Sequence, residues 1–290
     1  MPQWNCSCPN CQAARQGRLA PRGQSCVTIG DAQGGWYLVN ASPDLAAQIE
    51  RTPELQPRLQ PLRNSPIRAV LLTNADLDHI LGLFSLREGG PFAIYATAAV
   101  RAVAQQVLGL ETVLDCFCAA RWVEPSRGPF VSLDPNAPDH DLQYRAILLP
   151  GKPPPFAAAA AAGAQFAHSV AYQFLDPRTG GKLLVAPDVA AVNRELEIAL
   201  SGSDAVLFDG TFWSADELAR IRPGAKPAAE MGHLTVRDGS LDLLARLPAR
   251  KKIYIHINNT NPILAAGSAE RLAVETRGIV VGEDGLEFEL

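Results

Sequence analysis

Four side chains with oxygen or nitrogen donors stand together directly after a short apolar run at residues 67–73. They are Asn74, Asp76, Asp78 and His79. The apolar run predicts a buried strand, and a loop at a strand end can aim several side chains at one point because the strand holds its base rigid. Oxygen donors with one imidazole suit a hard or borderline divalent cation. In the alternative interpretation, Asp76 or Asp78 caps a helix that begins after the loop.

Three of the six cysteines lie close together near the start of the chain, at Cys6, Cys8 and Cys11. A soft cation such as Zn²⁺ takes tetrahedral thiolate or imidazole ligands, and a tight loop pre-organises three of them. The alternative is three unrelated free thiols, which the density of the cluster disfavours. No ligand position is left obviously open to water, so a structural site is favoured over a catalytic one. The fourth ligand comes from elsewhere, either Asn259 or a nearby imidazole.

Polar side chains also end three later apolar runs, which begin at residues 182, 205 and 252. Asp188, Asp209 and His256 occupy these positions. One polar residue at a strand end is usually a cap or a turn former, whereas four such ends in one chain predict a converging site. His233, on a loop, adds a further imidazole, and His168 precedes a strand and is another candidate ligand.

Short strands and helices alternate along the chain without a clear linker or an internal repeat. Strands are expected over residues 25–30, 36–40, 67–73, 92–96, 142–149, 169–175, 182–186, 205–208 and 252–257. Helical spacing covers about 80–87 and 98–108. Many short strands with helices between them predict a sheet-on-sheet core covered by helices.

Turn residues define the remaining local structure. Residues 31–35 predict a hairpin between the first two strands, and 279–282 with 286–290 predict a hairpin that closes the chain. The proline-rich and alanine-rich stretch at 150–164 predicts either a short helix or a flap over the site.

The composition excludes several classes of protein. Hydrophobic residues make up 47% and charged residues 19%, as in a globular protein, and the net charge of −4 argues against a nucleic-acid partner. No apolar run is long enough to span a membrane, and no secretion signal is expected, so the chain is predicted to be cytoplasmic. A reducing compartment favours metal binding over disulfides. Cys26, Cys116 and Cys118 are expected to be small buried hydrophobic residues.

Six motifs carry a resemblance to a known family. They are Pro2-Gln-Trp-Asn-Cys-Ser-Cys-Pro-Asn-Cys11, Asn40-Ala-Ser-Pro-Asp44, Asn74–His79, Asp209-Gly-Thr211, Met231-Gly-His-Leu234 and His256-Ile-Asn-Asn-Thr-Asn-Pro262. In this order they resemble the pyrroloquinoline quinone biosynthesis protein B family of the metallo-β-lactamase superfamily. The resemblance implies an α+β fold, the αββα metallo-β-lactamase sandwich, as a single domain over residues 1–290. Family members usually begin with an apolar strand ahead of the first motif, so either the first edge strand is expected to be missing here or the start site is set too late.

The resemblance also implies a structural zinc on Cys6, Cys8 and Cys11, and a separate active-site metal. In the superfamily the ligand loop is His-x-His-x-Asp-His, and here Asn74 and Asp76 replace its first two histidines. The loss of two imidazoles disfavours a dinuclear zinc site. Three residues then resemble the two-His-one-carboxylate set that suits Fe(II) or another divalent metal, namely Asp78, His79 and His256.

Further roles follow from the same resemblance. Asp188 falls where the superfamily has its metal-bridging Asp, and His168 near its middle His; Asp76 and Asp188 are expected to be additional ligands or to orient ligands. Asp209 and His233 look like the carboxylate–imidazole relay of related phosphodiesterases, in which the carboxylate orients the imidazole for proton transfer.

The activity implied by the resemblance is a hydroxylation in pyrroloquinoline quinone synthesis. An iron-dependent oxygenase would hydroxylate the tyrosine of a Glu–Tyr unit derived from a precursor peptide. One alternative is a phosphodiester or ester hydrolase with two metals. Another is a non-catalytic protein that carries the quinone or its precursor. The expected partners are this small peptide-derived substrate and other proteins of the pathway, with neither nucleic acid nor membrane.

Overall fold

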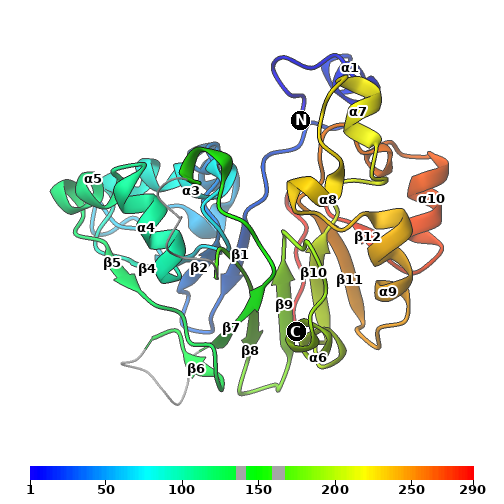
Figure 1. Cartoon of the computed structure of the whole chain (residues 1–290). Helices are drawn as coiled ribbons and strands as arrows, with labels where there is room; N and C mark the ends of the chain where they lie inside the picture. Colours follow the sequence, from blue (N-terminus) through cyan, green and yellow to red (C-terminus); the bar gives the residue numbers. More distant parts are fainter. Residues whose placement is uncertain (135–141, 159–166) are drawn as a thin grey trace. The chain divides into compact units, whose positions relative to one another are not determined.

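The computed structural model describes residues 1–134, 142–158 and 167–290 (Figure 1). It divides into two compact units. Residues 24–178 form one of them, which we call the central unit, and residues 1–23 with 179–290 form the other, the terminal unit. The single-domain organisation over residues 1–290 stays a prediction.

A sheet with strand order β1-β2-β3-β4-β5 forms the first part of the central unit. Its strands are β1 (Val27–Gly30), β2 (Trp36–Val39), β3 (Ile67–Leu71), β4 (Ala93–Tyr95) and β5 (Arg121–Val123). β1 and β2 are antiparallel, which confirms the predicted hairpin, and β2 to β5 run parallel. Asp31 fixes the turn of this hairpin, because its Oδ1 accepts hydrogen bonds from the backbone N–H groups of Gln33 and Gly35 at 2.8 and 2.7 Å.

Antiparallel strands and short helices complete the central unit. The strands are β6 (Val131–Ser132), β7 (Gln143–Leu149) and β8 (Ser169–Leu175), and the helices are α2 (Leu45–Arg51), α3 (Leu77–Ile80), α4 (Ala98–Gln106) and α5 (Leu110–Phe117). Fully buried side chains of the first sheet, among them Leu38, Val70 and Ile94, share one hydrophobic core with Val100 of α4 and Leu114 of α5. Short 3₁₀ helices cover Pro53–Leu55, Leu81–Glu88 and Pro155–Ala157.

The helix expected over 80–87 is divided in the structure, where α3 ends at Ile80 and a 3₁₀ helix follows. Gly82 lies against the preceding chain, and its N–H donates to the Ala41 carbonyl at 2.9 Å. A Cβ at this position would lie 2.2 Å from the Ser42 carbonyl oxygen. This close backbone contact requires glycine and tightens the helix locally.

Parallel strands form the sheet of the terminal unit, in the order β12-β11-β10-β9. They are β9 (Lys182–Ala186), β10 (Ala205–Asp209), β11 (Lys251–Ile255) and β12 (Val280–Val281), and β9, β10 and β11 are adjacent arrows in Figure 1. The helices are α1 (Pro9–Arg15), α6 (Arg194–Ser201), α7 (Glu217–Ile221), α8 (Ala228–Met231), α9 (Leu241–Ala245) and α10 (Ala269–Glu275), with a π-helical turn at Val236–Ser240 and a 3₁₀ turn at Pro262–Leu264. Every residue of β10 is buried, as is typical of a parallel strand covered on both faces.

Strand register in the terminal unit determines which side chains meet. Ala186, Phe208 and Tyr254 lie side by side across β9, β10 and β11. Because the strands are parallel, their carboxyl ends share one edge of the sheet, and the residues that follow leave the sheet at this edge.

Two local expectations are wrong. The closing hairpin does not form, since β12 pairs parallel with β11 and the described residues 286–290 contain no strand. Gly282 N–H donates to the Tyr254 carbonyl, so the residues around β12 continue the parallel sheet beside β11. Cys116 is exposed, because it lies two residues after the buried Leu114 and therefore on the opposite face of α5.

Other expectations have mixed outcomes. Cys118 is buried as expected, and Cys26 is half-buried with its thiol donating to the Asn40 carbonyl. The flap expected at 150–164 falls partly on residues 159–166, which lie outside the described residues. Among the described helices, none combines the length and the apolar character that a membrane span needs.

Candidate metal centres

One carboxylate and two imidazoles meet at the carboxyl edge of the terminal sheet. Asp188, His233 and His256 each offer one donor atom, and these atoms all lie within 4.8 Å of one another. Asp188 Oδ1 is 3.6 Å from His256 Nδ1 and 4.0 Å from His233 Nε2, and the two imidazole rings are stacked with their centroids 5.6 Å apart. Such a set of oxygen and nitrogen donors can hold a divalent cation.

Asp209, the last residue of β10, is completely buried beside this group. Among the described residues, four donors fill the lone-pair positions of its carboxylate. Its Oδ2 accepts from Val189 N at 2.9 Å and from His233 Nδ1 at 2.8 Å. Its Oδ1 accepts from the N–H and the hydroxyl of Thr211 at 2.9 and 2.6 Å.

This pairing stabilises the charged forms of both Asp209 and His233. Burial by itself would raise the pKa of Asp209, but the charge and the hydrogen bond of His233 outweigh burial and lower it. Burial would likewise lower the pKa of His233, and Asp209 raises it instead. The arrangement suits an imidazole that accepts and returns a proton.

His256 follows β11 directly and has a left-handed backbone, with φ at 55°. This conformation is unusual for a residue with a Cβ and persists only where the surroundings hold it. Thr211 Oγ1 lies 2.8 Å from His256 Nδ1, and Asn258 N donates to the Thr211 carbonyl at 3.1 Å. The turn at His256 therefore sends residues 257–261 back over the edge of the sheet.

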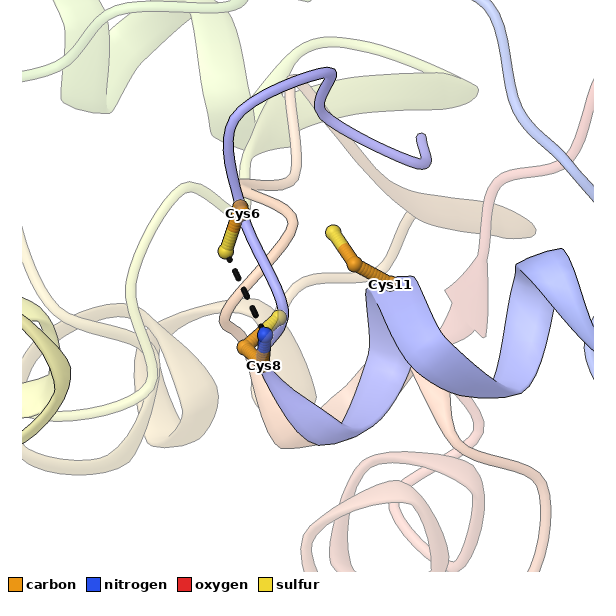
Figure 2. A group of neighbouring side chains, drawn as sticks. All are labelled: Cys6, Cys8 and Cys11. Carbon is orange, nitrogen blue, oxygen red and sulfur yellow. Dashed lines mark hydrogen bonds between the residues drawn. The ribbon is translucent and has the colours of Figure 1, made fainter.

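The second candidate centre is the cysteine cluster, which the structure brings together as the spacing predicts. Figure 2 shows the three side chains, with Cys11 on α1 and Cys8 directly before it. Their sulfur atoms lie within 4.8 Å of one another, and Cys8 N donates to Cys6 Sγ at 3.4 Å. Burial raises the pKa of Cys8 to about 11, so a bound cation is required to hold it as a thiolate at neutral pH.

Asn259 is the side chain that completes this cluster. Its Nδ2 lies 3.2, 3.5 and 3.3 Å from the sulfur atoms of Cys6, Cys8 and Cys11. The backbone carbonyl oxygen of Asn259 accepts from Asn10 Nδ2 at 3.0 Å, and Asn10 Nδ2 also donates to the backbone carbonyl of Asn261 at 2.8 Å. The sequence leaves the fourth partner open between Asn259 and an imidazole, and the structure places Asn259 there.

The residues of the loop after β3 belong to the central unit. Asn74 Oδ1 accepts from Asp76 N at 3.0 Å and so shapes the turn. Asp76 occupies the N-cap position of α3, but its side chain makes no capping hydrogen bond, which disfavours the capping role for this residue. His79 is buried, with Nδ1 3.2 Å from Thr73 Oγ1 and Nε2 3.9 Å from Asp78 Oδ2.

The sequence interpretation does not identify the residues that support the candidate ligands in each unit. In the central unit, Asn40 accepts from Thr73 N at 2.8 Å and donates to Thr73 Oγ1 at 2.9 Å, which holds the hydroxyl beside His79. Thr211 has the corresponding place beside His256. The family motifs contain Asn40 and Thr211, but nothing local in the sequence distinguishes a supporting hydroxyl from an ordinary turn residue. His168, a candidate ligand in the sequence, is buried directly before β8.

Glu217 is a buried carboxyl that the sequence does not single out. It accepts from Trp213 N at 2.6 Å and from Thr260 Oγ1 at 2.5 Å, so it braces the segment that carries Asn259. Burial raises its pKa to about 7, above the ordinary value of 4.5.

Glu217→Gln is expected to remove a pH dependence of stability. The folded protein binds this proton more tightly than the unfolded chain, so the stability that it contributes is fully present below pH 4.5 and declines until pH 7. The decline amounts to about 3 kcal/mol. Urea unfolding between pH 4.5 and 8 measures this decline, because the free energy of unfolding of the parent is expected to fall relative to that of the variant as the pH rises. Glu230→Gln, on an exposed carboxyl of the same unit, is the control; curves for Glu217→Gln that stay parallel to the parent would contradict this assignment.

Known proteins resemble this chain over its whole length. The beta-lactamase superfamily domain matches residues 35–257. Coenzyme PQQ synthesis protein B of Ruegeria pomeroyi is 40% identical, and that of Rhodopseudomonas palustris 39%, in both cases over 100% of this chain and 96% of the relative. A crystal structure of Zn²⁺-bound PqqB from Methylobacterium extorquens, 37% identical, matches with a TM-score of 0.88 over 100% of this chain and 95% of that one. The chain therefore has the metallo-β-lactamase fold and belongs to the coenzyme PQQ synthesis protein B family.

Proposed function

We propose that this chain acts in pyrroloquinoline quinone synthesis as a metal-dependent oxygenase. The substrate is a Glu–Tyr unit derived from the precursor peptide, and the reaction hydroxylates its tyrosine ring. Membership of the family supports the pathway, and the group Asp188, His233 and His256 beside the buried Asp209 carries the chemical part of the proposal. We also propose a cytoplasmic setting in which the chain meets other proteins of the pathway.

The carboxylate and imidazole donors of the proposed active site fit a metal ion of the Fe(II) type. We propose Asp78, His79 and His256 as its ligands on the basis of the family motifs, with Asp76 and Asp188 as further ligands or orienting groups. Carboxylate oxygens and imidazole nitrogens without thiolates suit Fe(II) better than a soft cation. When bound, the iron supplies the activation of dioxygen on which a ring hydroxylation depends.

His233 is proposed to move the proton of the phenol. Its Nδ1 is held by Asp209 at 2.8 Å, so Nε2 is the nitrogen that can exchange a proton with a substrate. The side chain is 13% exposed, so the imidazole is not sealed off from the site. A fixed carboxylate that stabilises the imidazolium lowers the cost of accepting the proton.

The cysteine cluster is proposed to hold a structural zinc through Cys6, Cys8, Cys11 and Asn259. Three converging sulfur atoms and one amide would supply the four ligands that a structural zinc takes, and a half-turn of the Asn259 amide would bring its oxygen to the sulfur-facing position. The similarity to a Zn²⁺-bound relative supports zinc, as does the burial of Cys8 and Cys11.

Asp78→Ala tests the proposed function. Protein purified without oxygen and loaded with Fe(II) is given O₂ and a Glu–Tyr peptide, and mass spectrometry is expected to show the gain of one oxygen atom. In Asp78→Ala, loss of the iron is expected to reduce this gain more than about 100-fold, while the zinc content stays unchanged. Asp238→Ala, at an exposed carboxylate, is the control and should behave as the parent does.

Two outcomes would contradict the proposal. Full turnover in Asp78→Ala would show that the ligand assignment is wrong. No mass gain in well-folded, iron-loaded parent protein would remove the oxygenase function and favour a non-catalytic carrier, which binds the quinone or its precursor tightly without turnover.

A further inference from the structure

The hydroxyl of Thr211 lies between the buried carboxylate and a proposed metal ligand. Its Oγ1 is 2.6 Å from Asp209 Oδ1 and 2.8 Å from His256 Nδ1, and it is also 2.8 Å from the His256 carbonyl oxygen. A hydroxyl has one proton to donate and two lone pairs to accept with. The partner that receives this proton therefore determines whether Nδ1 of the His256 imidazole must donate or accept a hydrogen bond.

An oxygen acceptor receives the proton, either Asp209 Oδ1 at 2.6 Å or the His256 carbonyl oxygen at 2.8 Å, and in both cases no proton is left for His256 Nδ1. Asp209 is completely buried and accepts only, and 2.6 Å is the length of a hydroxyl–carboxylate hydrogen bond. With the proton directed at His256 Nδ1 instead, the lone pairs of Thr211 would face both the buried Asp209 carboxylate and the His256 carbonyl oxygen without a proton between them, which is strongly unfavourable. Thr211 Oγ1 then acts as an acceptor toward His256, and Nδ1 of the imidazole must carry a hydrogen.

We infer that Thr211 is a positioning residue that fixes the tautomer of His256, with the proton on Nδ1 and the lone pair on Nε2. A neutral imidazole binds a metal through the nitrogen without a proton, so Nε2 becomes the ligand atom. Asp209 thus orients both imidazoles of the group, His233 directly and His256 through Thr211. The inference rests on the proposed function only in taking His256 as a metal ligand.

The backbone around Thr211 holds the hydroxyl in place. Its N–H donates to Asp209 Oδ1, and its carbonyl accepts from Asn258 N and from Asn261 Nδ2, at 3.1 and 3.3 Å. The preceding Gly210 lies so close to β11 that a Cβ there would be 2.9 Å from the Tyr254 Cβ. Only a small residue with a hydroxyl can meet both Asp209 and His256 from this position.

The tautomer can be measured without metal or substrate. Protein labelled with ¹⁵N in its five histidines is studied at pH 8, above the usual imidazole pKa, by long-range ¹H–¹⁵N correlation, and His256 is assigned by its loss in His256→Gln. The expected spectrum of the parent has the His256 hydrogen on Nδ1. In Thr211→Val, which replaces the hydroxyl by a methyl group, His256 is expected to shift toward the Nε2–H form, whereas Thr211→Ser should retain the parental form.

Metal affinity gives a second readout. Protein already saturated with one zinc is titrated anaerobically with Fe(II), and Thr211→Val is expected to bind it about 10- to 100-fold more weakly, as for loss of other groups that orient a ligand. Thr211→Ser should restore binding to within about threefold of the parent. Thr276→Val makes the same substitution at an exposed helix end of the terminal unit, and it should change neither the tautomer nor the affinity.

Either of two results would overturn the inference. The first is a parent protein with the His256 hydrogen on Nε2, which needs no variant and does not depend on how Thr211→Val folds. The second is a folded Thr211→Val with parental tautomer and affinity. Because these readouts require no turnover, a failed hydroxylation assay with the expected tautomer would remove the proposed function and leave the role of Thr211 intact.

Discussion

Cys8→Ser is expected to remove one equivalent of bound zinc and to destabilise the protein more than the loss of a large side chain from its hydrophobic core would. Structural zinc contributes on the order of 10 kcal/mol of binding free energy in small zinc-dependent domains. A typical large-to-small core substitution costs about 2–5 kcal/mol. Metal analysis and thermal unfolding of the purified variant measure the two effects.

The same substitution is expected to weaken Fe(II) binding at a site that it does not touch. Asn259 contacts the cysteine sulfurs three residues after His256, and Asn10 binds the carbonyls of Asn259 and Asn261. The cysteine cluster therefore holds the segment that positions His256. When that hold is lost, the left-handed backbone at His256 loses part of its support.

Cys116→Ser is the matched control, because Cys116 is an exposed thiol outside the cluster. It should leave zinc content, unfolding temperature and iron affinity unchanged. The reciprocal variant, Asp188→Asn, should keep the zinc and lose affinity for iron. A Cys8→Ser protein that retains its zinc, or loses it without any change in stability, would contradict the proposed structural site.

Asp209→Asn is expected to lower the free energy of unfolding by about 3–5 kcal/mol at pH 7, the usual cost of breaking a buried charge pair. An amide has one oxygen, so whichever way it is turned its NH₂ group faces donors. One orientation places the NH₂ against Val189 N and His233 Nδ1, and the other places it against the N–H of Thr211. At least one buried donor then has no acceptor.

The substitution should also return the pKa of His233 toward lower values, because Asp209 is what raises it. Urea unfolding measures the loss of stability, and ¹⁵N chemical shifts of His233 across a pH titration measure the change in pKa. Asp238→Asn, at an exposed carboxylate, provides the control. A stability within about 1 kcal/mol of the parent would show that the four donors do not depend on the charge of Asp209.

Features that depend on neighbouring residues can be predicted from this sequence. The cysteine cluster forms within a few residues, and the turn at Asp31 joins β1 to β2 through hydrogen bonds inside the turn. Apolar runs give most strands to within a few residues, as β3 and β10 illustrate. Polar residues at the strand ends give the candidate ligands Asp188 and His256, since parallel strands end at one edge of their sheet.

Contacts between distant residues were decided only by the tertiary structure. Asn259 reaches the cysteine cluster from about 250 positions away in the chain, and Thr211 meets His256 across 45. The parallel pairing of β12 replaces the predicted hairpin for the same reason, because sheet register and not chain proximity selects the partner of a strand. The sequence by itself determined which residue types are available for metal binding. The motifs already implied that Asp209 orients His233, whereas only the fold brought Thr211 between the same buried carboxylate and His256.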